Sequence, residues 1–114
     1  MISGAVSDSG AAYMMSKRAN TLRVQYASVE WGDRGARLNA ISPGIILTPL
    51  AKEEMEGPGH ERYQAVIRTS AAKRVGTTDE IASAAAYLAE ANFITGSDLL
   101  IDGGVIAAMR AGRL

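Results

Sequence analysis

A tyrosine and a lysine four positions apart are the residues of this chain best suited to chemistry. Tyr13 precedes Lys17 near the start of a strongly helical stretch, and helical spacing of four places both side chains on one face, one turn apart. A lysine ammonium beside a phenol favours the phenolate, so the phenol pKa falls from about 10 towards neutrality. The pair is therefore suited to giving a proton to, or taking one from, a carbonyl or an alcohol.

Two longer patterns lie downstream of this pair. The first reads N-x-I-x-P-G-x-x-x-T from Asn39 to Thr48, and the second reads I-T-G-S-x-L-x-I-D-G-G from Ile94 to Gly104. With Y-x-x-x-K, in this order and at these separations, they resemble the second half of the short-chain dehydrogenase/reductase family over nearly the whole chain. The resemblance implies an NAD(P)-dependent oxidoreductase that transfers hydride between nicotinamide and a small alcohol or ketone substrate.

The resemblance also implies how the catalytic residues work. Tyr13 is the acid/base, while Lys17 lowers the tyrosine pKa and hydrogen-bonds the nicotinamide ribose. The family's carbonyl-polarising serine usually lies farther ahead of the tyrosine than the serines here. Ser3 serves only if the intervening loop is shortened, and otherwise it is a helix-capping or loop residue. The enoyl-reductase branch usually spaces its tyrosine and lysine more widely, which counts against that branch.

Residues 43–48 are the predicted nicotinamide-binding segment. A short strand is expected to end at Pro43, and ligands bind at the carboxyl ends of strands in open parallel sheets. Gly44 removes a side chain where the backbone approaches a flat ring, and a backbone N–H or C=O near Ile46 binds the carboxamide. Thr48 offers a hydroxyl to a phosphate oxygen. A second, compatible interpretation makes Thr48 the N-cap of a helix that begins at the next residue.

The first half of the family's pattern has no counterpart here. No glycine-rich turn for the cofactor pyrophosphate precedes Tyr13, and the residue that separates NAD from NADP is missing, so the cofactor is NAD or NADP. We interpret residues 1–114 as a partial domain, the C-terminal part of a Rossmann-like, doubly wound parallel sheet in three α/β/α layers. Met1 would then be an internal methionine of a longer enzyme.

Three further expectations follow, two for the chain alone and one for the complete enzyme. Losing the phosphate cradle removes most cofactor affinity, so we expect little turnover from this chain by itself. Two strands cannot cover the faces of three helices, so the chain is expected to fold poorly or to self-associate. The complete enzyme is expected to be a dimer or a tetramer.

The elements that must position these residues begin with a helix over residues 11–31, ended by Gly32 and Gly35. An apolar stripe recurs along it at steps of four and three, opposite the tyrosine and lysine. We expect one face against a sheet and another partly against a neighbouring subunit. The apolar stripe of this helix consists of Met15, Ala19, Leu22, Tyr26 and Val29. A short strand over residues 37–42 follows the helix.

A polar segment over residues 51–68 comes next, with a Gly-Pro-Gly break between two short helices. A segment of this kind beside a ligand site is expected to act as a movable lid. The only histidine, His60, lies at the break, and an isolated exposed histidine is more often without function than in contact with substrate.

The last elements are a helix and a strand. The helix is expected over residues 81–89, capped by Thr77 or Thr78. The strand is expected to begin at Phe93, and its apolar run at residues 99–101 is typical of a strand covered on both faces. An Asp-Gly-Gly turn follows, and the tail after it is expected to reach a neighbouring subunit.

Composition limits the classes of partner. The 114 residues carry 12 basic and 12 acidic side chains and no cysteine. Balanced charge argues against nucleic acid or a membrane surface as partner. No apolar run spans a bilayer, and the first residues lack a secretory signal, so we expect a cytoplasmic protein. Without cysteine, a cysteine-based metal site is excluded, and we predict no metal.

Two alternatives from other functional classes remain open. A non-catalytic oligomerisation or regulatory remnant would keep the helices and strands and would bind nucleotide without turnover. A lyase or epimerase on the same scaffold would use the same tyrosine and lysine without net cofactor consumption. A net change in NAD(P)H absorbance during turnover is expected only for the oxidoreductase.

Overall fold

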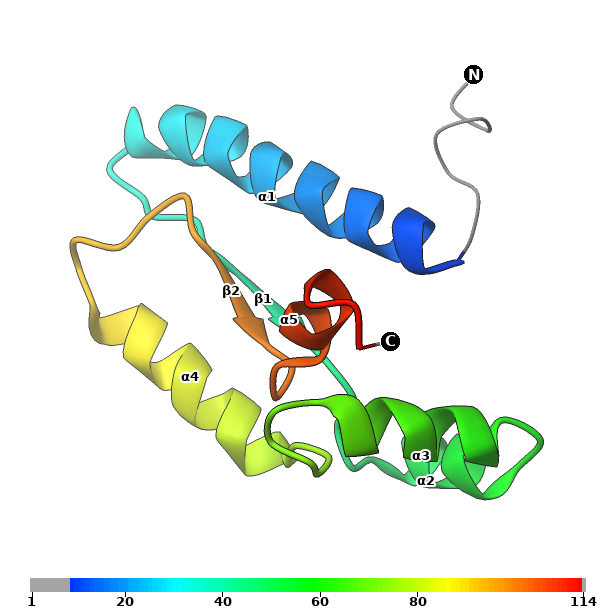
Figure 1. The fold of residues 1–114 in the computed structure, drawn as a ribbon. Coiled ribbons are helices and arrows are strands. Elements are labelled where there is room, and N and C mark those ends of the chain that lie inside the picture. Colours follow the sequence, from blue (N-terminus) through cyan, green and yellow to red (C-terminus); the bar gives the residue numbers. More distant parts are fainter. Residues whose placement is uncertain (1–8, 114) are drawn as a thin grey trace. The chain divides into compact units, whose positions relative to one another are not determined.

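A computed structural model of the protein describes residues 9–113, in which helices lie before, between and after two strands (Figure 1). This combination agrees with the α/β class expected from the sequence. In chain order the elements are α1 (Ser9–Gly32), β1 (Ala40–Pro43), α2 (Pro49–Glu56), α3 (His60–Thr69), α4 (Thr78–Glu90), β2 (Asp98–Ile101) and α5 (Val105–Arg110).

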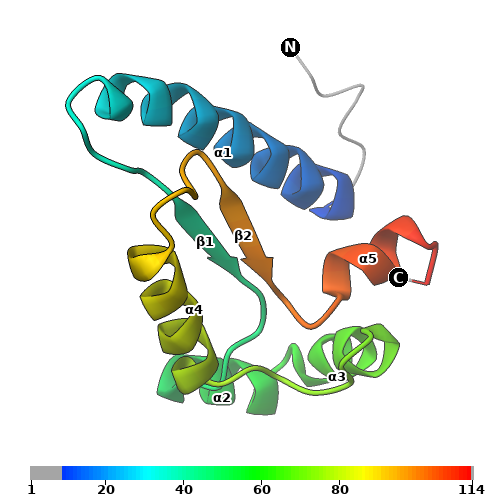
Figure 2. The ribbon, with the colours of Figure 1, turned by 90° about the vertical axis from the view of Figure 1, so that its left-hand side faces the viewer.

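The sheet consists of β1 paired with β2. Ala40 N–H donates to Ser97 O at 2.9 Å, and Gly44 N–H donates to Ile101 O at 2.9 Å. Residue numbers rise together along the two strands, so the pairing is parallel, as Figure 2 shows. The carboxyl end of β1 therefore leads directly into the segment that the sequence assigns to the nicotinamide.

The described chain divides into two compact units. One contains the part up to Ala40 together with Ala91–Leu99, and the other contains Ile41–Glu90 together with the part from Leu100 onward. The tyrosine and lysine of the first motif belong to the first unit, and the loop after β1 belongs to the second. Each unit is described by itself below.

In the first unit, α1 packs through a face that carries small polar side chains. Thr21 Oγ1 donates to Asp98 Oδ2 at 3.3 Å. Ser28 is buried, and its Oγ lies 2.7 Å from the position that a Cβ would occupy at Gly96. Gly96 has a φ of +75°, so glycine is favoured there both by the backbone conformation and by the close approach of the helix.

This packing shows which face of α1 is covered within the first unit. Tyr26 is 83% exposed and Val29 is 68% exposed, so the apolar stripe is not that face. The close approach at Gly96 admits only a small side chain such as Ser28. Contact of another face with a neighbouring subunit stays a prediction, and the predicted limits of the helix are confirmed to within two residues.

The predictions that strands begin at residue 37 and at Phe93 are wrong. Both strands are shorter than predicted, and the segments before them are joined by one backbone hydrogen bond, from Gly96 N–H to Leu38 O at 2.8 Å, and by several side-chain bonds. The Nη1 of Arg37 and the Nδ2 of Asn39 donate to Ile94 O at 3.0 and 2.9 Å. Leu38 N–H donates to the hydroxyl of Thr95 at 3.1 Å. These bonds hold residues 93–97 in an irregular loop.

In the second unit, α2 and α3 form a pair of short helices on either side of the Gly-Pro-Gly break, as predicted. The Tyr63 hydroxyl donates to Glu54 Oε2 at 2.6 Å and so joins the two helices. This hydrogen bond, with a smaller contribution from burial, raises the pKa of Tyr63 above its ordinary value. His60 Nδ1 lies 2.8 Å from Met55 O, at the beginning of α3.

The helix α5 packs against α3 and has no counterpart in the sequence-based prediction. Ile106 and Ala108 of α5 are buried, and Leu88 of α4 completes the buried hydrophobic residues of the described chain. The prediction that β2 is covered on both faces is wrong, since Leu100 is 42% exposed. A sheet of two strands offers few neighbours to cover such a residue.

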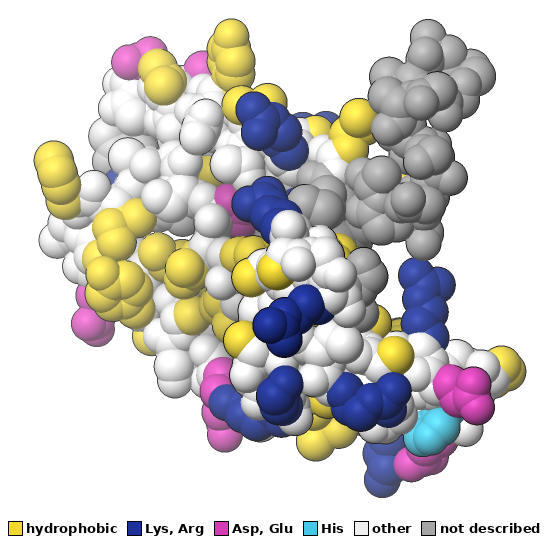
Figure 3. Space-filling model, in the orientation of Figure 1, with side chains coloured by type: hydrophobic (Ala, Val, Ile, Leu, Met, Phe, Trp, Pro, Cys, Tyr) yellow, Lys and Arg dark blue, Asp and Glu magenta, His cyan; other side chains and the backbone are white. Residues whose placement is uncertain are grey.

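Because few hydrophobic side chains are buried, many large hydrophobic side chains are exposed on the surface of the described residues. Figure 3 shows hydrophobic side chains gathered over α4, and charged side chains of both signs over α2 and α3. None of the described helices is both long and apolar enough to cross a bilayer.

Candidate functional site

The tyrosine and lysine of the first motif lie on α1. This helix runs without interruption from Ser9 to Gly32, so Tyr13 and Lys17 are one helical turn apart in the backbone. Lys17 is partly buried, and its carbonyl oxygen accepts a hydrogen bond from Thr21 Oγ1 at 3.1 Å. The side chain of Tyr13 and the whole of Ser3 lie outside the described part of the structure.

The loop after β1 starts with a close backbone approach at Gly44. A Cβ there would lie 2.7 Å from Asp102 Cβ and 2.8 Å from Asp102 Cα. Real carbon atoms do not approach so closely, so the neighbour that requires glycine at this position is the turn after β2. Pro43, the last residue of β1, is exposed beside it.

The middle of the loop is held by Gly76. Gly76 N–H donates to Ile45 O at 2.9 Å, and Leu47 N–H donates to Gly76 O at 2.9 Å, which forms a parallel bridge between Ile46 and Gly76. Successive peptide groups of an extended chain point in opposite directions. The N–H and C=O of Ile46 itself therefore face away from Gly76. A neighbouring donor and acceptor of this kind can bind a carboxamide.

Thr48 is the N-cap of α2, as one of the two interpretations predicted. Its backbone is extended, and its Oγ1 accepts a hydrogen bond from Ala51 N–H at 3.1 Å. Pro49, which has no N–H to leave unpaired, is the first residue of the helix. A hydroxyl oxygen that accepts one bond can still donate its own proton, so the phosphate-binding interpretation stays a prediction.

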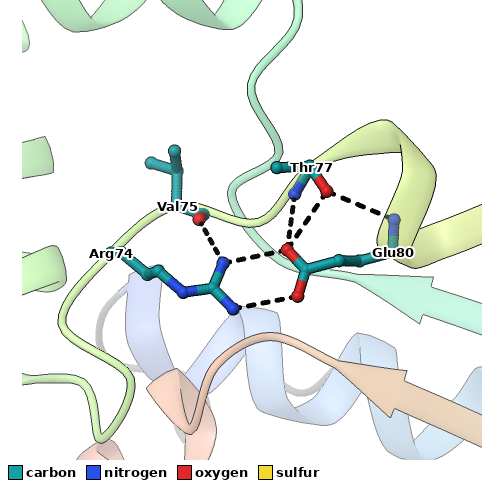
Figure 4. Close-up of polar contacts among 4 residues, drawn as sticks. All are labelled: Arg74, Val75, Thr77 and Glu80. Carbon is teal, nitrogen blue, oxygen red and sulfur yellow. Dashed lines mark hydrogen bonds and ion pairs between the residues drawn. The ribbon is translucent and has the colours of Figure 1, made fainter.

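A network around Glu80 lies next to this loop (Figure 4). Arg74 Nη1 and Nη2 bind the two carboxylate oxygens of Glu80 at 2.8 and 2.9 Å. Thr77 N–H donates to Glu80 Oε1 at 3.1 Å, and Glu80 N–H donates to Thr77 Oγ1 at 3.2 Å. The Arg74 hydrogen bond, followed by those from Thr77, lowers the pKa of Glu80 to about 2.

The sequence contained part of the signal for this network. The T-x-x-E spacing is that of a capping box, and Thr77 was predicted as a cap, which the structure confirms. Sequence reasoning missed the partner, because Arg74 lies in an irregular segment where no helical spacing applies.

The Asp-Gly-Gly turn after β2 completes this side of the second unit. Asp102 Oδ1 accepts from Gly104 N–H, and Asp102 Oδ2 accepts from Ile106 N–H, both at 2.9 Å, which caps α5. Ala72 N–H donates to Gly103 O at 2.8 Å. The turn thus holds the segment that leads to Gly76, and a hollow of about 230 Å³ lies between this segment and the loop after β1.

Metal ligands do not gather in the described part of the chain. No group of three or more His, Asp or Glu side chains among residues 9–113 is placed to hold a metal ion. The groups of the candidate site described above are hydroxyls, peptide groups, the amine of Lys17 and the Arg74–Glu80 ion pair.

Comparison with known proteins extends these observations. A family model described as "Enoyl-(Acyl carrier protein) reductase" matches residues 1–106. The chain is 44% identical over 104 residues to the short-chain dehydrogenase/reductase bsc3 of Alternaria brassicicola, an alignment that covers 90% of this chain and 38% of the relative.

Two solved structures are also similar. One is a 4-hydroxyisoleucine dehydrogenase mutant complexed with NADH and succinate, with 35% identity and a TM-score of 0.68 over 85% of this chain and 40% of that one. The other is ElxO with NADP bound, with 34% identity and a TM-score of 0.66 over 83% of this chain and 39% of that one. These structures confirm the α/β fold class.

The chain spans about two fifths of the length of each of these proteins. The matched family model covers nearly the whole chain, and all three sequence patterns lie inside the matched region. The chain belongs to the short-chain dehydrogenase/reductase family.

Proposed function

We propose that this chain carries the acid/base pair and the nicotinamide-binding loop of an NAD(P)-dependent oxidoreductase acting on a small alcohol or carbonyl substrate. The observation that carries this proposal is the continuity of α1, which keeps Tyr13 and Lys17 one turn apart. The loop of residues 43–48 adds support, because it follows the carboxyl end of a parallel strand.

The groups in the loop suit the nicotinamide end of the cofactor. Ile46 offers an N–H and a C=O that face away from Gly76, which matches the donor and acceptor of a carboxamide. Thr48 has a hydroxyl proton to donate to a phosphate oxygen. Pro43 and Gly44 complete the segment. When bound, the nicotinamide supplies or accepts the hydride.

In this proposal Tyr13 gives the proton to the substrate oxygen during reduction and takes it during oxidation. Lowering a phenol pKa from about 10 to about 7 takes roughly 4 kcal/mol of differential stabilisation. A single partly solvated lysine supplies only part of this, so Lys17 is proposed to act with a further positive charge near the tyrosine. Lys17 is also proposed to bind the ribose.

Four other functions compete with this proposal. The description of the matched family model names enoyl reduction, but the short Tyr13–Lys17 spacing counts against that branch. A lyase, an epimerase or a non-catalytic remnant would use the same fold.

The complete protein is proposed to form a homo-oligomer.

Saturation-transfer NMR with NADH tests which end of the cofactor the chain binds. Because the proposed contacts all concern the nicotinamide half, we expect stronger transfer to the nicotinamide protons than to the adenine protons. Thr48→Ser should keep this pattern, and Thr48→Ala should weaken it. Equal transfer to both ends, or none, contradicts the proposed loop.

Turnover separates the oxidoreductase from its alternatives. The chain is incubated with NADH or NADPH and a panel of small ketones and enoyl thioesters, and nicotinamide absorbance is followed. We expect a slow loss of absorbance with a ketone, because no glycine-rich turn for the cofactor pyrophosphate precedes Tyr13. The rate should fall about 10²–10⁴-fold further in Tyr13→Phe because a general acid is removed. Nucleotide binding without any absorbance change favours the remnant, and product formation without such a change favours the lyase or epimerase.

A further inference from the structure

The Arg74–Glu80 ion pair encloses a short stretch of backbone. Arg74 Nη1 donates to Val75 O at 3.0 Å as well as to Glu80. On the other side of Gly76, Glu80 Oε1 accepts from both the N–H and the hydroxyl of Thr77, at 3.1 and 3.2 Å. The peptide groups on both sides of Gly76 are therefore fixed by one ion pair (Figure 4).

Gly76 in turn fixes the loop after β1. Its N–H and C=O bind Ile45 O and Leu47 N–H, both at 2.9 Å. The approach is close, since a Cβ on Gly76 would lie 2.8 Å from Ile46 Cδ1. Arg74, Glu80, Gly76 and Ile46 thus form a continuous series of contacts within the second unit.

The exposure of the ion pair indicates that its effect is local. The Arg74 and Glu80 side chains are 58% and 45% exposed, and exposed ion pairs contribute little to global stability. The bidentate geometry nevertheless fixes the direction of both side chains, because the planar guanidinium binds both carboxylate oxygens. A pair of this kind can order a backbone segment without determining whether the unit folds.

We propose that Arg74 and Glu80 are positioning residues that hold the Ile45–Leu47 segment, and with it the outward-facing peptide groups of Ile46, in the conformation that binds the nicotinamide carboxamide. This inference rests on the proposed function of the loop and adds to it the residues that order it. Neither side chain contacts the carboxamide in this account; both act through Gly76.

Three variants isolate the ion pair. Glu80→Gln keeps a side-chain oxygen for the Thr77 cap but loses the charge that Arg74 binds. Arg74→Lys keeps the positive charge but loses the planar, bidentate contact. Glu90→Gln is the matched control, because it makes the same change at the other end of α4.

Amide hydrogen exchange of Leu47 and Gly76 is the first readout, and it needs no cofactor. In Glu80→Gln and Arg74→Lys we expect both amides to exchange about three- to tenfold faster, as suits the loss of an exposed but bidentate pair. In Glu90→Gln they should exchange as in the wild type. Unchanged exchange in the first two variants, or an unprotected Leu47 in the wild type, overturns the proposal.

Saturation transfer to NADH is the second readout, and it distinguishes the inference from the function on which it rests. The two variants should lose transfer to the nicotinamide protons, whereas Glu90→Gln should keep it. Faster exchange with unchanged nicotinamide transfer shows that the pair orders the loop without serving the cofactor, and it overturns the positioning role. No transfer in the wild type overturns the proposed function, while exchange still decides whether the pair orders the loop.

Discussion

Gly44→Ala is the substitution whose effect follows most directly from the structure. The new Cβ would lie 2.7 Å from Asp102 Cβ and 2.8 Å from Asp102 Cα. Because the Asp102 Cα belongs to the backbone, rotation of a side chain cannot relieve the overlap. Either the end of β1 or the turn after β2 must move.

The movement would weaken hydrogen bonds on both sides. Gly44 N–H donates to Ile101 O at 2.9 Å, and the Asp102 carboxylate accepts from Gly104 and Ile106 N–H at 2.9 Å each. Overpacking of a tight contact costs typically about 1–3 kcal/mol. We expect the free energy of unfolding of Gly44→Ala to fall within this range.

Urea unfolding followed by circular dichroism measures this loss, with all variants at one protein concentration. Gly32→Ala is the control, because nothing lies within 4 Å of a Cβ at Gly32 and alanine suits the end of a helix. Its unfolding free energy should equal the wild-type value or exceed it by up to about 1 kcal/mol.

Hydrogen exchange locates the effect. The amides of Gly104 and Ile106 should exchange faster in Gly44→Ala and should be unchanged in Gly32→Ala. If Gly44→Ala unfolds at the wild-type urea concentration and leaves both amides unchanged, the reasoning about this contact is refuted.

Four further predictions can be checked separately. The pKa of the Glu80 carboxyl should be about 2 in an NMR titration, and Arg74→Gln should raise this pKa towards 4.5. Since the pKa is lowered in the folded state, the stabilisation that the Glu80 carboxylate contributes is present above pH 4.5 and disappears as the pH falls through about 2. The Tyr63 phenol should ionise above its ordinary pKa of 10.0 in an absorbance titration, and Glu54→Gln should lower that value. Thr48→Ala should cost about 1 kcal/mol in urea unfolding by loss of the cap, and Thr48→Ser should restore most of it. The chain alone should self-associate in sizing chromatography because hydrophobic side chains are exposed; a monomer with a cooperative thermal transition contradicts this.

Local chemistry explains which features could be predicted from the sequence. The limits of α1 follow from a long helical stretch ended by glycine, and the caps at Thr48 and Thr77 need only residues three positions away. The break between α2 and α3 follows from Gly-Pro-Gly, which disfavours helix locally. These signals lie within a few residues of the feature that they specify.

Contacts between distant segments explain what could not be predicted. The covered face of α1 includes Ser28, which lies against Gly96, and the apolar stripe is exposed. The loop before β2 is bound by Arg37 and Asn39, which lie 57 and 55 residues before Ile94. No periodicity within a single element carries this information.

The features of the candidate site also separate into those that nearby residues determine and those that distant contacts determine. The candidate residues came from motif positions, whereas the bridge that orients Ile46 depends on Gly76, and the ion pair around Gly76 depends on an irregular segment. The motif therefore indicated which residues to consider, and the structure supplied the contacts that hold their backbone.

The most direct test of the central claim is an NADH titration of the ¹⁵N-labelled chain, with the Ile46 amide as the reporter. We predict that this resonance shifts in a saturable way as NADH is added. An Ile46 resonance that stays fixed while other residues report NADH binding would contradict the assignment of this loop to the nicotinamide.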